Sequence, residues 1–324
     1  DFRGRPIEVA AEDYHPPRQG QHLILTIDAN IQMIAEEELT AACEKFEAKR
    51  GEVVVMNPRT GDVLALGNWP TFNPQNIEDS TPAIRRDKSL TDPYEPGSTI
   101  KPFIAGPAMG WNITRPNEVW PINSITWNPF GHRIVRDVEH YGPLSTWDVL
   151  VKSSNIGMSM LGTRMGNARL HEALEEFGFG RRTGIDHTGE DPGLVRPLAK
   201  WGHNSTISVS HSYEIMVTPL QLCRAFCAYG NGGRLVDPHL IKGFLDDQGN
   251  IISRSDPKQL KLLPQVIDPM TAAAMKRILC DVVIRGTASH SRSNTWNIFG
   301  KTGTSHISQG KRGYSQTRMN SSFI

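Results

Sequence analysis

Three short motifs, widely separated along the chain, constrain its fold more than any other sequence feature. In chain order they are Ser98-Thr99-Ile100-Lys101, Ser153-Ser154-Asn155 and Lys301-Thr302-Gly303-Thr304. Each motif is too short to be informative alone. Together they supply serines, two lysines and an asparagine, and these side chains can act on one another only if the fold brings the three segments into one cleft.

The first motif has to be distinguished from two other copies of its pattern. A serine followed by a lysine three positions later occurs at Ser98/Lys101, Ser255/Lys258 and Ser308/Lys311. Pro257 and Gly310 indicate turns at the second and third copies, where the two side chains would not share a face. The sequence after Ser98 is compatible with a buried helix, in which residues three apart lie on one face, so Lys101 is expected to contact Ser98. Pro102 is tolerated in a first turn, so the helix is predicted to begin at about Ser98.

This arrangement suits nucleophilic catalysis by serine. A serine hydroxyl is a weak nucleophile and must lose its proton as it attacks, and a neutral lysine can accept that proton. Burial or a second cation must lower the pKa of Lys101, and Lys301 would be that cation. The N–H groups of Ser98 and Thr304 would stabilise an oxyanion. For the first motif alone, a solvated Lys101 after a helix-capping Ser98 is the simpler interpretation.

The second motif is predicted to lie between two helices. Ser145 offers a helix cap, and Asn155 stands where one helix could end and another begin. From such a junction Ser153 could relay a proton between a lysine and the leaving group, while Asn155 could bind a substrate amide or hold Lys101 in place. An ordinary polar turn between helices is the alternative.

The third motif is predicted to lie on a strand over residues 297–304. Gly300 and Gly303 lack side chains, so another backbone, such as an extended substrate, could approach closely. Lys301 and the hydroxyls of Thr302 and Thr304 would bind a substrate carboxylate. The alternative is a glycine-containing edge strand with no such role.

With these motifs in place, the chain resembles the transpeptidase domain of class B penicillin-binding proteins along nearly its whole length. The resemblance includes residues 25–32, 53–65 and 217–222. It implies the α+β fold shared by penicillin-binding proteins and serine β-lactamases. It also implies acylation by a D-Ala-D-Ala stem peptide, transfer to an amine of a neighbouring strand, and covalent inhibition by β-lactams. Residues 90–92 and 95–98 are more similar to the division-specific, FtsI-type members of the class.

The resemblance also implies a domain organisation and a location. Residues 1–20 would end an upstream pedestal or linker, and residues 21–324 would form the transpeptidase domain, with its last strands and closing helix missing. A membrane anchor upstream would hold the domain on the periplasmic side of the inner membrane. The partners would be peptidoglycan stem peptides, a membrane glycan polymerase and division proteins.

The remaining sequence predicts a mixed fold without cofactors. A strand over 23–27, a helix capped by Asp28, a hairpin over 53–66, helices over most of 98–230, a hairpin near residue 249 and a helix from Pro269 give an antiparallel sheet flanked by helices, plus an all-helical lobe. The 35 basic and 34 acidic residues argue against a nucleic-acid partner. The four cysteines lack the spacing of a metal site and are interpreted as core thiols.

Two other functions share these motifs. A class A serine β-lactamase needs a glutamate to activate the deacylating water, and the acidic segment at Glu190 lacks the expected Glu-x-x-Leu-Asn pattern. A non-enzymatic β-lactam sensor or scaffold would also be acylated. Residues 211–214 and His306 depart from the class pattern near the expected cleft, and His306 is interpreted as a solvated loop residue.

Overall fold

The computed structural model describes residues 20, 22–129, 131, 134–246, 248–253 and 263–324. The α-helices are α1 (Ala29–Lys45), α2 (Pro82–Arg85), α3 (Lys88–Thr91), α4 (Pro102–Gly110), α5 (Thr146–Val151), α6 (Asn155–Glu176), α7 (Ser205–Ser210), α8 (Pro219–Gly230) and α9 (Pro269–Arg285). The strands are β1 (Leu23–Leu25), β2 (Gly51–Met56), β3 (Val63–Trp69), β4 (Val119–Trp120), β5 (Thr126–Trp127), β6 (Val135–Arg136), β7 (Leu144–Ser145), β8 (Leu194–Val195), β9 (Ile215–Met216), β10 (Ile241–Leu245), β11 (Ile251–Ser253), β12 (Thr302–Ser308) and β13 (Tyr314–Phe323). Short 3-10 turns include η3 (Gly97–Ile100) and η7 (Gly310–Arg312). The predicted domain segment 1–20 lies almost wholly outside the described residues.

The elements predicted from local signals are confirmed. Asp28 caps α1 by accepting hydrogen bonds from two backbone N–H groups, and β2 and β3 form the expected antiparallel hairpin. Thr218 and Gln221 form a reciprocal capping box at the start of α8. Asp268 caps α9, and the second hairpin is β10–β11. These features depend on contacts between residues close in sequence, which is why sequence patterns predict them.

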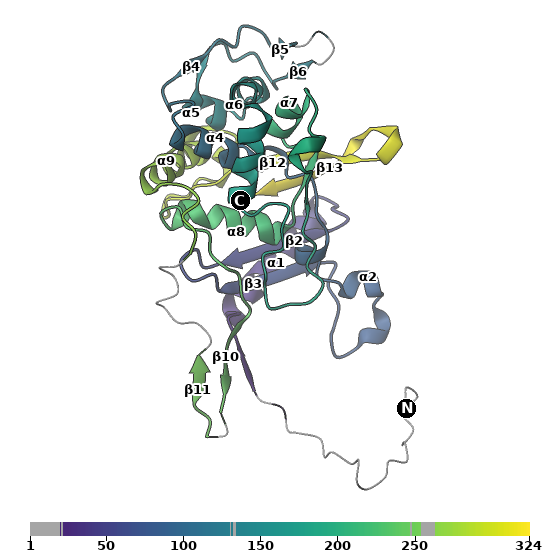
Figure 1. Cartoon of the computed structure of the whole chain (residues 1–324). Coiled ribbons are helices and arrows are strands. Elements are labelled where there is room, and N and C mark those ends of the chain that lie inside the picture. Colours follow the sequence, from purple (N-terminus) through teal and green to yellow (C-terminus); the bar gives the residue numbers. More distant parts are fainter. Residues whose placement is uncertain (1–19, 21, 130, 132–133, 247, 254–262) are drawn as a thin grey trace.

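A helical lobe forms most of the core. Figure 1 shows α4, α5, α6 and α9 gathered at one end of the molecule, with α8 between them and the β2–β3 hairpin. Residues 102–109 of α4 are all buried. Phe103 on α4 packs against Phe177 and Phe179, with ring centroids 4.9 and 5.2 Å apart, and against Tyr229 of α8 at 5.7 Å. α4, the helix that follows the first motif, is therefore buried among other elements of the lobe.

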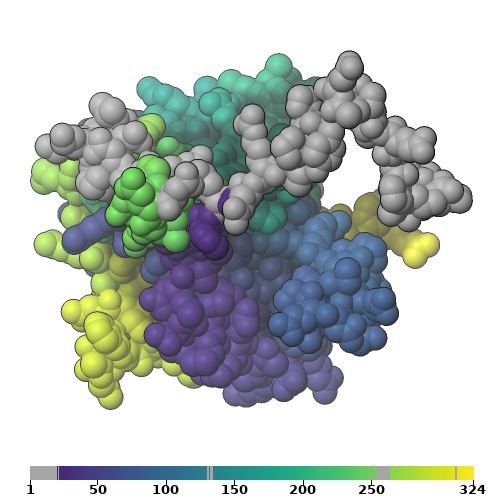
Figure 2. All heavy atoms as spheres, turned by 90° about the horizontal axis from the view of Figure 1, so that it is seen from below, coloured from purple at the N-terminus to yellow at the C-terminus, as the bar shows by residue number. Residues whose placement is uncertain are grey.

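The N-terminal elements form a continuous surface below this lobe. In Figure 2, seen from the lower end of Figure 1, the purple surface of α1, β2 and β3 lies beside the blue surface of the segment that leads from β3 toward α4. The buried face of α1 is small. Cys43 is buried, but Ile34 and Phe46 are 54% and 75% exposed, because the β2–β3 hairpin covers one side of α1.

Two details differ from the sequence predictions. The strand of the third motif begins at Thr302, five residues later than predicted. The region 98–230 contains short strand pairs, β4–β7, β5–β6 and β8–β9, beside its helices. α6 has a kink at Gly166, where φ is 74°, so its second half begins at Asn167. Two-residue strands carry too little periodicity to be recognised from sequence.

The sheets are all antiparallel within the described residues. β1, β10 and β11 form a three-stranded sheet, and β2–β3 and β12–β13 are two-stranded. The mixed helix and strand content confirms the predicted α+β class. Among the described residues, no helix combines the length and apolarity needed to span a bilayer.

Candidate active site

Ser98 lies in a tight turn packed against the strand of the third motif. It belongs to η3, and α4 begins only at Pro102, so the predicted helix start at Ser98 is four residues too early. Gly97 has φ +61°, and a Cβ there would lie 2.6 to 2.8 Å from the backbone O, N and C of Thr304. Only glycine fits both the left-handed conformation and this approach. The close approach brings the backbone of the Ser98 turn beside that of Thr304.

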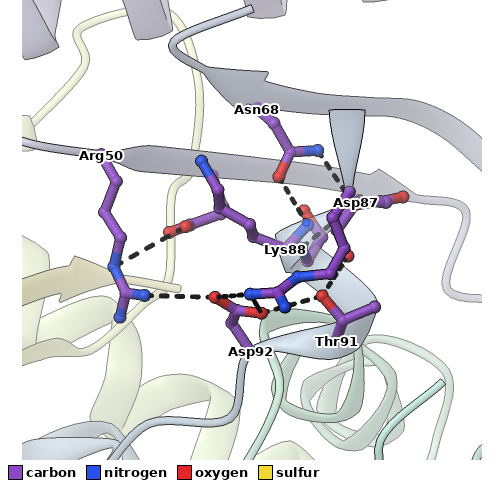
Figure 3. A network of polar contacts seen from close by, with 9 residues as sticks. Arg50, Asn68, Asp87, Lys88, Thr91 and Asp92 are labelled. Carbon is purple, nitrogen blue, oxygen red and sulfur yellow. Dashed lines mark hydrogen bonds and ion pairs between the residues drawn. The ribbon is translucent and has the colours of Figure 1, made fainter. Parts of the chain in front are cut away.

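The segment before Ser98 is anchored to the β2–β3 hairpin. Asn68 on β3 donates to Asp87 at 2.9 Å and accepts from the N–H of Lys88 at 2.9 Å, and Arg50 reaches Asp92 at 3.5 Å (Figure 3). These contacts hold α3 at both ends. The turn that carries Ser98 therefore begins from a rigid support.

The glycines of the third motif do permit close approach, but of this chain's own backbone. A Cβ on Gly303 would lie 2.7 Å from the carbonyl oxygen of Pro96, and one on Gly300 would lie 2.5 Å from the carbonyl oxygen of Ile324. Ser305 adds a hydrogen bond from its hydroxyl to the Glu95 carbonyl oxygen at 2.6 Å. β12 is thereby attached along one face to the turn that carries Ser98.

Lys101 is fully buried, and its ammonium group faces the second motif. Its Nζ donates to the Ser153 carbonyl oxygen at 2.6 Å, to Asn155 Oδ1 at 2.8 Å and to Ser153 Oγ at 3.3 Å. Within the described residues, no hydrogen bond joins Nζ to the Ser98 hydroxyl; the two residues are joined through the backbone, Lys101 N to Ser98 O at 3.3 Å. Burial lowers the pKa of Lys101 from 10.5 to about 7, against an opposing effect of Asp137.

Lys301, the residue directly before β12, approaches the same hydroxyl. Its Nζ donates to Ser153 Oγ at 2.9 Å and to the Thr302 carbonyl oxygen at 3.1 Å. Burial, and then the neighbouring Lys101, hold the pKa of Lys301 well below its ordinary value. The two lysines therefore meet at one oxygen atom, and each disfavours charge on the other.

Ser153 joins these groups because of its unusual backbone. It lies between α5 and α6 with φ +59°, a left-handed conformation that is uncommon for a residue other than glycine. In this conformation both its carbonyl oxygen and its hydroxyl oxygen accept from the lysines. A hydroxyl oxygen that accepts twice still has its own proton to donate. Such strain is typical of functional positions.

Asn155 is the first residue of α6, as predicted. Its Oδ1 accepts from Lys101, and its Nδ2 donates to the Arg136 carbonyl oxygen at 3.0 Å. Both ends of the amide are thus engaged by the protein. Of the two roles predicted for Asn155, holding Lys101 is the one that these contacts favour.

Sequence reasoning did not identify Asp137, which lies behind this group. Its side chain is 3% exposed and accepts from Ser154 Oγ at 2.6 Å and from the backbone N–H groups of Asn155 and Ile156 at 2.5 and 3.1 Å. No local motif marks this residue. The only sequence signal is an acidic residue, between Arg136 and Val138, directly after a two-residue strand.

The remaining predicted residues of the third motif lie on β12. Thr302 Oγ1 lies 2.6 Å from Thr287 Oγ1, and Thr304 is exposed. The prediction that His306 is a solvated loop residue is wrong, since it is half-buried on β12. Of the other Ser-x-x-Lys copies, Ser308 is the exposed last residue of β12, and the copy at 255–258 lies outside the described residues.

Residues 211–214 are connected through Tyr314 to the turn that carries Ser98. Tyr213 packs edge-on against Tyr314, with ring centroids 5.0 Å apart, and the Tyr314 hydroxyl donates to Glu95 Oε1 at 2.8 Å. Glu214 forms an ion pair with Arg196. Glu95 is the residue before Pro96-Gly97-Ser98, so this contact connects the 211–214 segment and β13 to the start of the turn.

Glu190, the candidate deacylating residue of a β-lactamase, forms hydrogen bonds with a nearby loop. It is 7% exposed, and its carboxylate accepts from the backbone N–H groups of Thr183 and Gly184 at 2.6 and 3.1 Å. A carboxylate used in this way shapes a loop.

Comparisons with known proteins agree with this geometry. The family model described as "Penicillin binding protein transpeptidase domain" matches residues 51–324. The chain is 32% identical over 310 residues to a Pseudomonas aeruginosa protein described as "Probable peptidoglycan D,D-transpeptidase PbpC", covering 95% of this chain and 52% of that one. It is 35% identical over 234 residues to "Peptidoglycan D,D-transpeptidase FtsI" of Escherichia coli K12, covering 72% of this chain and 39% of that one.

A solved structure matches the fold closely. Penicillin-binding protein 3 of Mycobacterium tuberculosis, complexed with aztreonam, superposes with a TM-score of 0.88 at 28% identity, covering 96% of this chain and 70% of that one. The chain spans about half or less of the length of the curated relatives described above. The predicted family is confirmed: the chain belongs to the penicillin-binding protein transpeptidase domain family, as a class B member.

Proposed function

We propose that this protein is a peptidoglycan D,D-transpeptidase that forms an acyl-enzyme on Ser98 and is covalently inhibited by β-lactams. The observation that carries the proposal is the pair of buried lysines that meet at the Ser153 hydroxyl, directly behind the turn that holds Ser98. Named relatives are D,D-transpeptidases, and a similar structure contains a β-lactam.

Acylation follows from the arrangement of the donors and acceptors. Ser98 Oγ attacks the carbonyl carbon of the penultimate D-alanine, or of the β-lactam ring, and its proton passes to neutral Lys101 Nζ. The N–H groups of Ser98 and Thr304 bind the resulting oxyanion, an interaction worth roughly 10²–10³-fold in rate per donor. The C–N bond then breaks, and the leaving amine takes a proton through Ser153 Oγ.

The two lysines have different tasks in this scheme. Lys101 has to be neutral before it accepts a proton, and a pKa of about 7 makes a large neutral fraction available near neutrality. Lys301 and the hydroxyls of Thr302 and Thr304 bind the carboxylate of the terminal D-alanine or of the drug. Gly303 keeps this strand flat against the nucleophile turn.

Transfer completes the cycle when an amine of a neighbouring stem peptide attacks the ester carbonyl and gives up a proton to neutral Lys101. The C–Oγ bond then breaks, and Ser98 Oγ leaves with that proton from Lys101. A bound penicillin keeps its leaving portion in the site, so only water can release it. With Glu190 engaged by backbone amides, that water lacks a carboxylate base from this segment. Slow release of the drug is therefore expected, which argues against a β-lactamase.

For the intact protein, we propose an extracytoplasmic catalytic domain over residues 21–324 that acts in cell division. The upstream anchor at the inner membrane, the pedestal domain, a glycan polymerase and division proteins belong to this proposal. Similarity to FtsI supports the division subtype, and the Glu95-Pro96-Gly97-Ser98 sequence agrees with it.

Intact-mass spectrometry of the protein incubated with a penicillin tests the chemistry. The mass should increase by that of the drug, Ser98→Ala should abolish the increase, and Ser308→Ala, which alters another copy of the pattern, should retain it. A donor peptide ending in D-Ala-D-Ala should then release D-alanine when an acceptor amine is present.

Two outcomes would replace the proposal. Penicillin turnover at about one per second or faster would identify a β-lactamase. Stable acylation without any D-alanine release would identify a β-lactam sensor or scaffold.

A further inference from the structure

The carboxylate of Asp137 makes contacts that all converge on the start of α6. Asp137 directly follows β6, and it is 3% exposed. Oδ2 accepts from the Ser154 hydroxyl, and Oδ1 accepts from the backbone N–H groups of Asn155 and Ile156. These N–H groups have no partner within the helix, so the carboxylate satisfies them and interacts favourably with the helix dipole.

The same strand end holds the Asn155 side chain. The Arg136 carbonyl oxygen accepts from Asn155 Nδ2 at 3.0 Å, which turns Oδ1 of the amide toward Lys101. Asn155 is therefore held through its backbone by Asp137 and through its amide by Arg136. Because Ser153 precedes this cap by one residue, its left-handed conformation is confined between the end of α5 and the Asp137 contacts.

The charge of Asp137 matters because two lysines are buried nearby. Burial lowers the pKa of Lys101, and the anionic Asp137 opposes that change. Lys301, directly before β12, lies close to Lys101. Tyr141 and the exposed Glu139 follow Asp137 on the same segment. The pKa of Tyr141 is raised by burial, then by Glu139 and Asp137, so this ring stays neutral near neutral pH.

We propose that Asp137 is a positioning residue for acylation: its carboxylate holds the start of α6 so that Ser153 and Asn155 face Lys101. This inference rests on the proposed function for its kinetic part. Asp137 touches neither the substrate nor the Ser98 hydroxyl in this scheme, and it acts through Ser154, Asn155 and Ile156.

The substitution Asp137→Asn separates charge from shape in the intact protein. An asparagine Oδ1 can still accept from the two N–H groups, whereas the negative charge is lost. Lys101 then loses its electrostatic support, its pKa falls further, and the rising limb of the acylation rate against pH moves to lower pH by about half a unit or more. Asp137→Glu keeps the charge and displaces the cap, so the limb stays in place while the plateau rate falls up to roughly 10²-fold.

Asp268→Asn is the matched control. Asp268 caps α9 through the Thr271 N–H, it is exposed, and asparagine is an equally good cap. Neither the limb nor the plateau should change in this variant. The rate to be measured is the second-order rate of labelling by a fluorescent penicillin across the pH range.

A second readout does not require acylation. The ¹³Cε chemical shift of Lys101, assigned by its loss in Lys101→Met, reports the midpoint of its titration directly. That midpoint should be lower in Asp137→Asn than in the wild type. An unchanged midpoint in this variant, or a wild-type plateau in Asp137→Glu, would overturn the inference. If the titration midpoint of Lys101 differs between the wild type and Asp137→Asn, but the wild type is never labelled by the penicillin, only the proposed function would be contradicted.

Discussion

Replacing Lys101 by methionine should remove acylation and also make the stability of the fold less dependent on pH. Methionine has a similar length and no charge, so the variant tests the cost of burying an ammonium group. The pKa of Lys101 is 10.5 ordinarily and about 7 in the fold, where burial is the main cause. Between these two values the unfolded chain binds more protons than the folded one, so the stability of the wild type must rise with pH.

The size of the effect follows from that difference. At ~1.4 kcal/mol per pKa unit, the buried lysine costs roughly 4 kcal/mol near pH 7 and about 2 kcal/mol near pH 9. The wild type should therefore gain about 2 kcal/mol over this interval from Lys101, on top of changes shared with the variant. Lys101→Met also leaves Ser153 O and Asn155 Oδ1 without a donor, but that cost does not vary with pH and cancels from the slope.

Urea unfolding at several pH values between about 7 and 9, followed by tryptophan fluorescence, measures the free energy of unfolding in each protein. Lys242→Met is the matched control, because Lys242 is solvent-exposed on β10, and it should keep the wild-type slope. If Lys101→Met and the wild type gained stability equally with pH, within about 0.5 kcal/mol, the buried-lysine argument would be refuted.

Three further changes test other parts of the site. Lys101→Arg keeps a charge that cannot be removed near neutral pH, so the acylation rate should fall by about 10²-fold or more; a rate within tenfold of wild type would remove Lys101 as the base. Gly97→Ala should lower the labelling rate by roughly 10²-fold, because its Cβ would force the Thr304 backbone away; unchanged labelling would contradict this. Glu190→Gln should lower thermal stability through weaker bonds to Thr183 and Gly184, at about 1 kcal/mol, and leave the lifetime of the penicillin adduct unchanged; a much longer lifetime would make Glu190 the deacylating base.

Helix caps and the first hairpin could be predicted because their causes are local. Asp28, Ser145, Thr218 and Asp268 each stand next to the N–H groups that they cap, so residue type and spacing are sufficient. The order of the three motifs likewise predicted the family, since such sets rarely arise together by chance. The sequence did not predict which hydrogen-bond partner each residue of these motifs would have.

The tertiary structure decided how those residues meet. Sequence spacing suggested that Lys101 would face Ser98, but its donors point to Ser153 and Asn155, because η3 ends at Ile100 and α4 starts only after Lys101. The close approach at Gly97 depends on a strand some 200 residues later. Asp137 carries no motif at all. The sequence by itself therefore determined the local elements and the reactive groups, whereas burial, pKa values and hydrogen-bond partners depend on contacts between distant segments, which only the folded chain brings together.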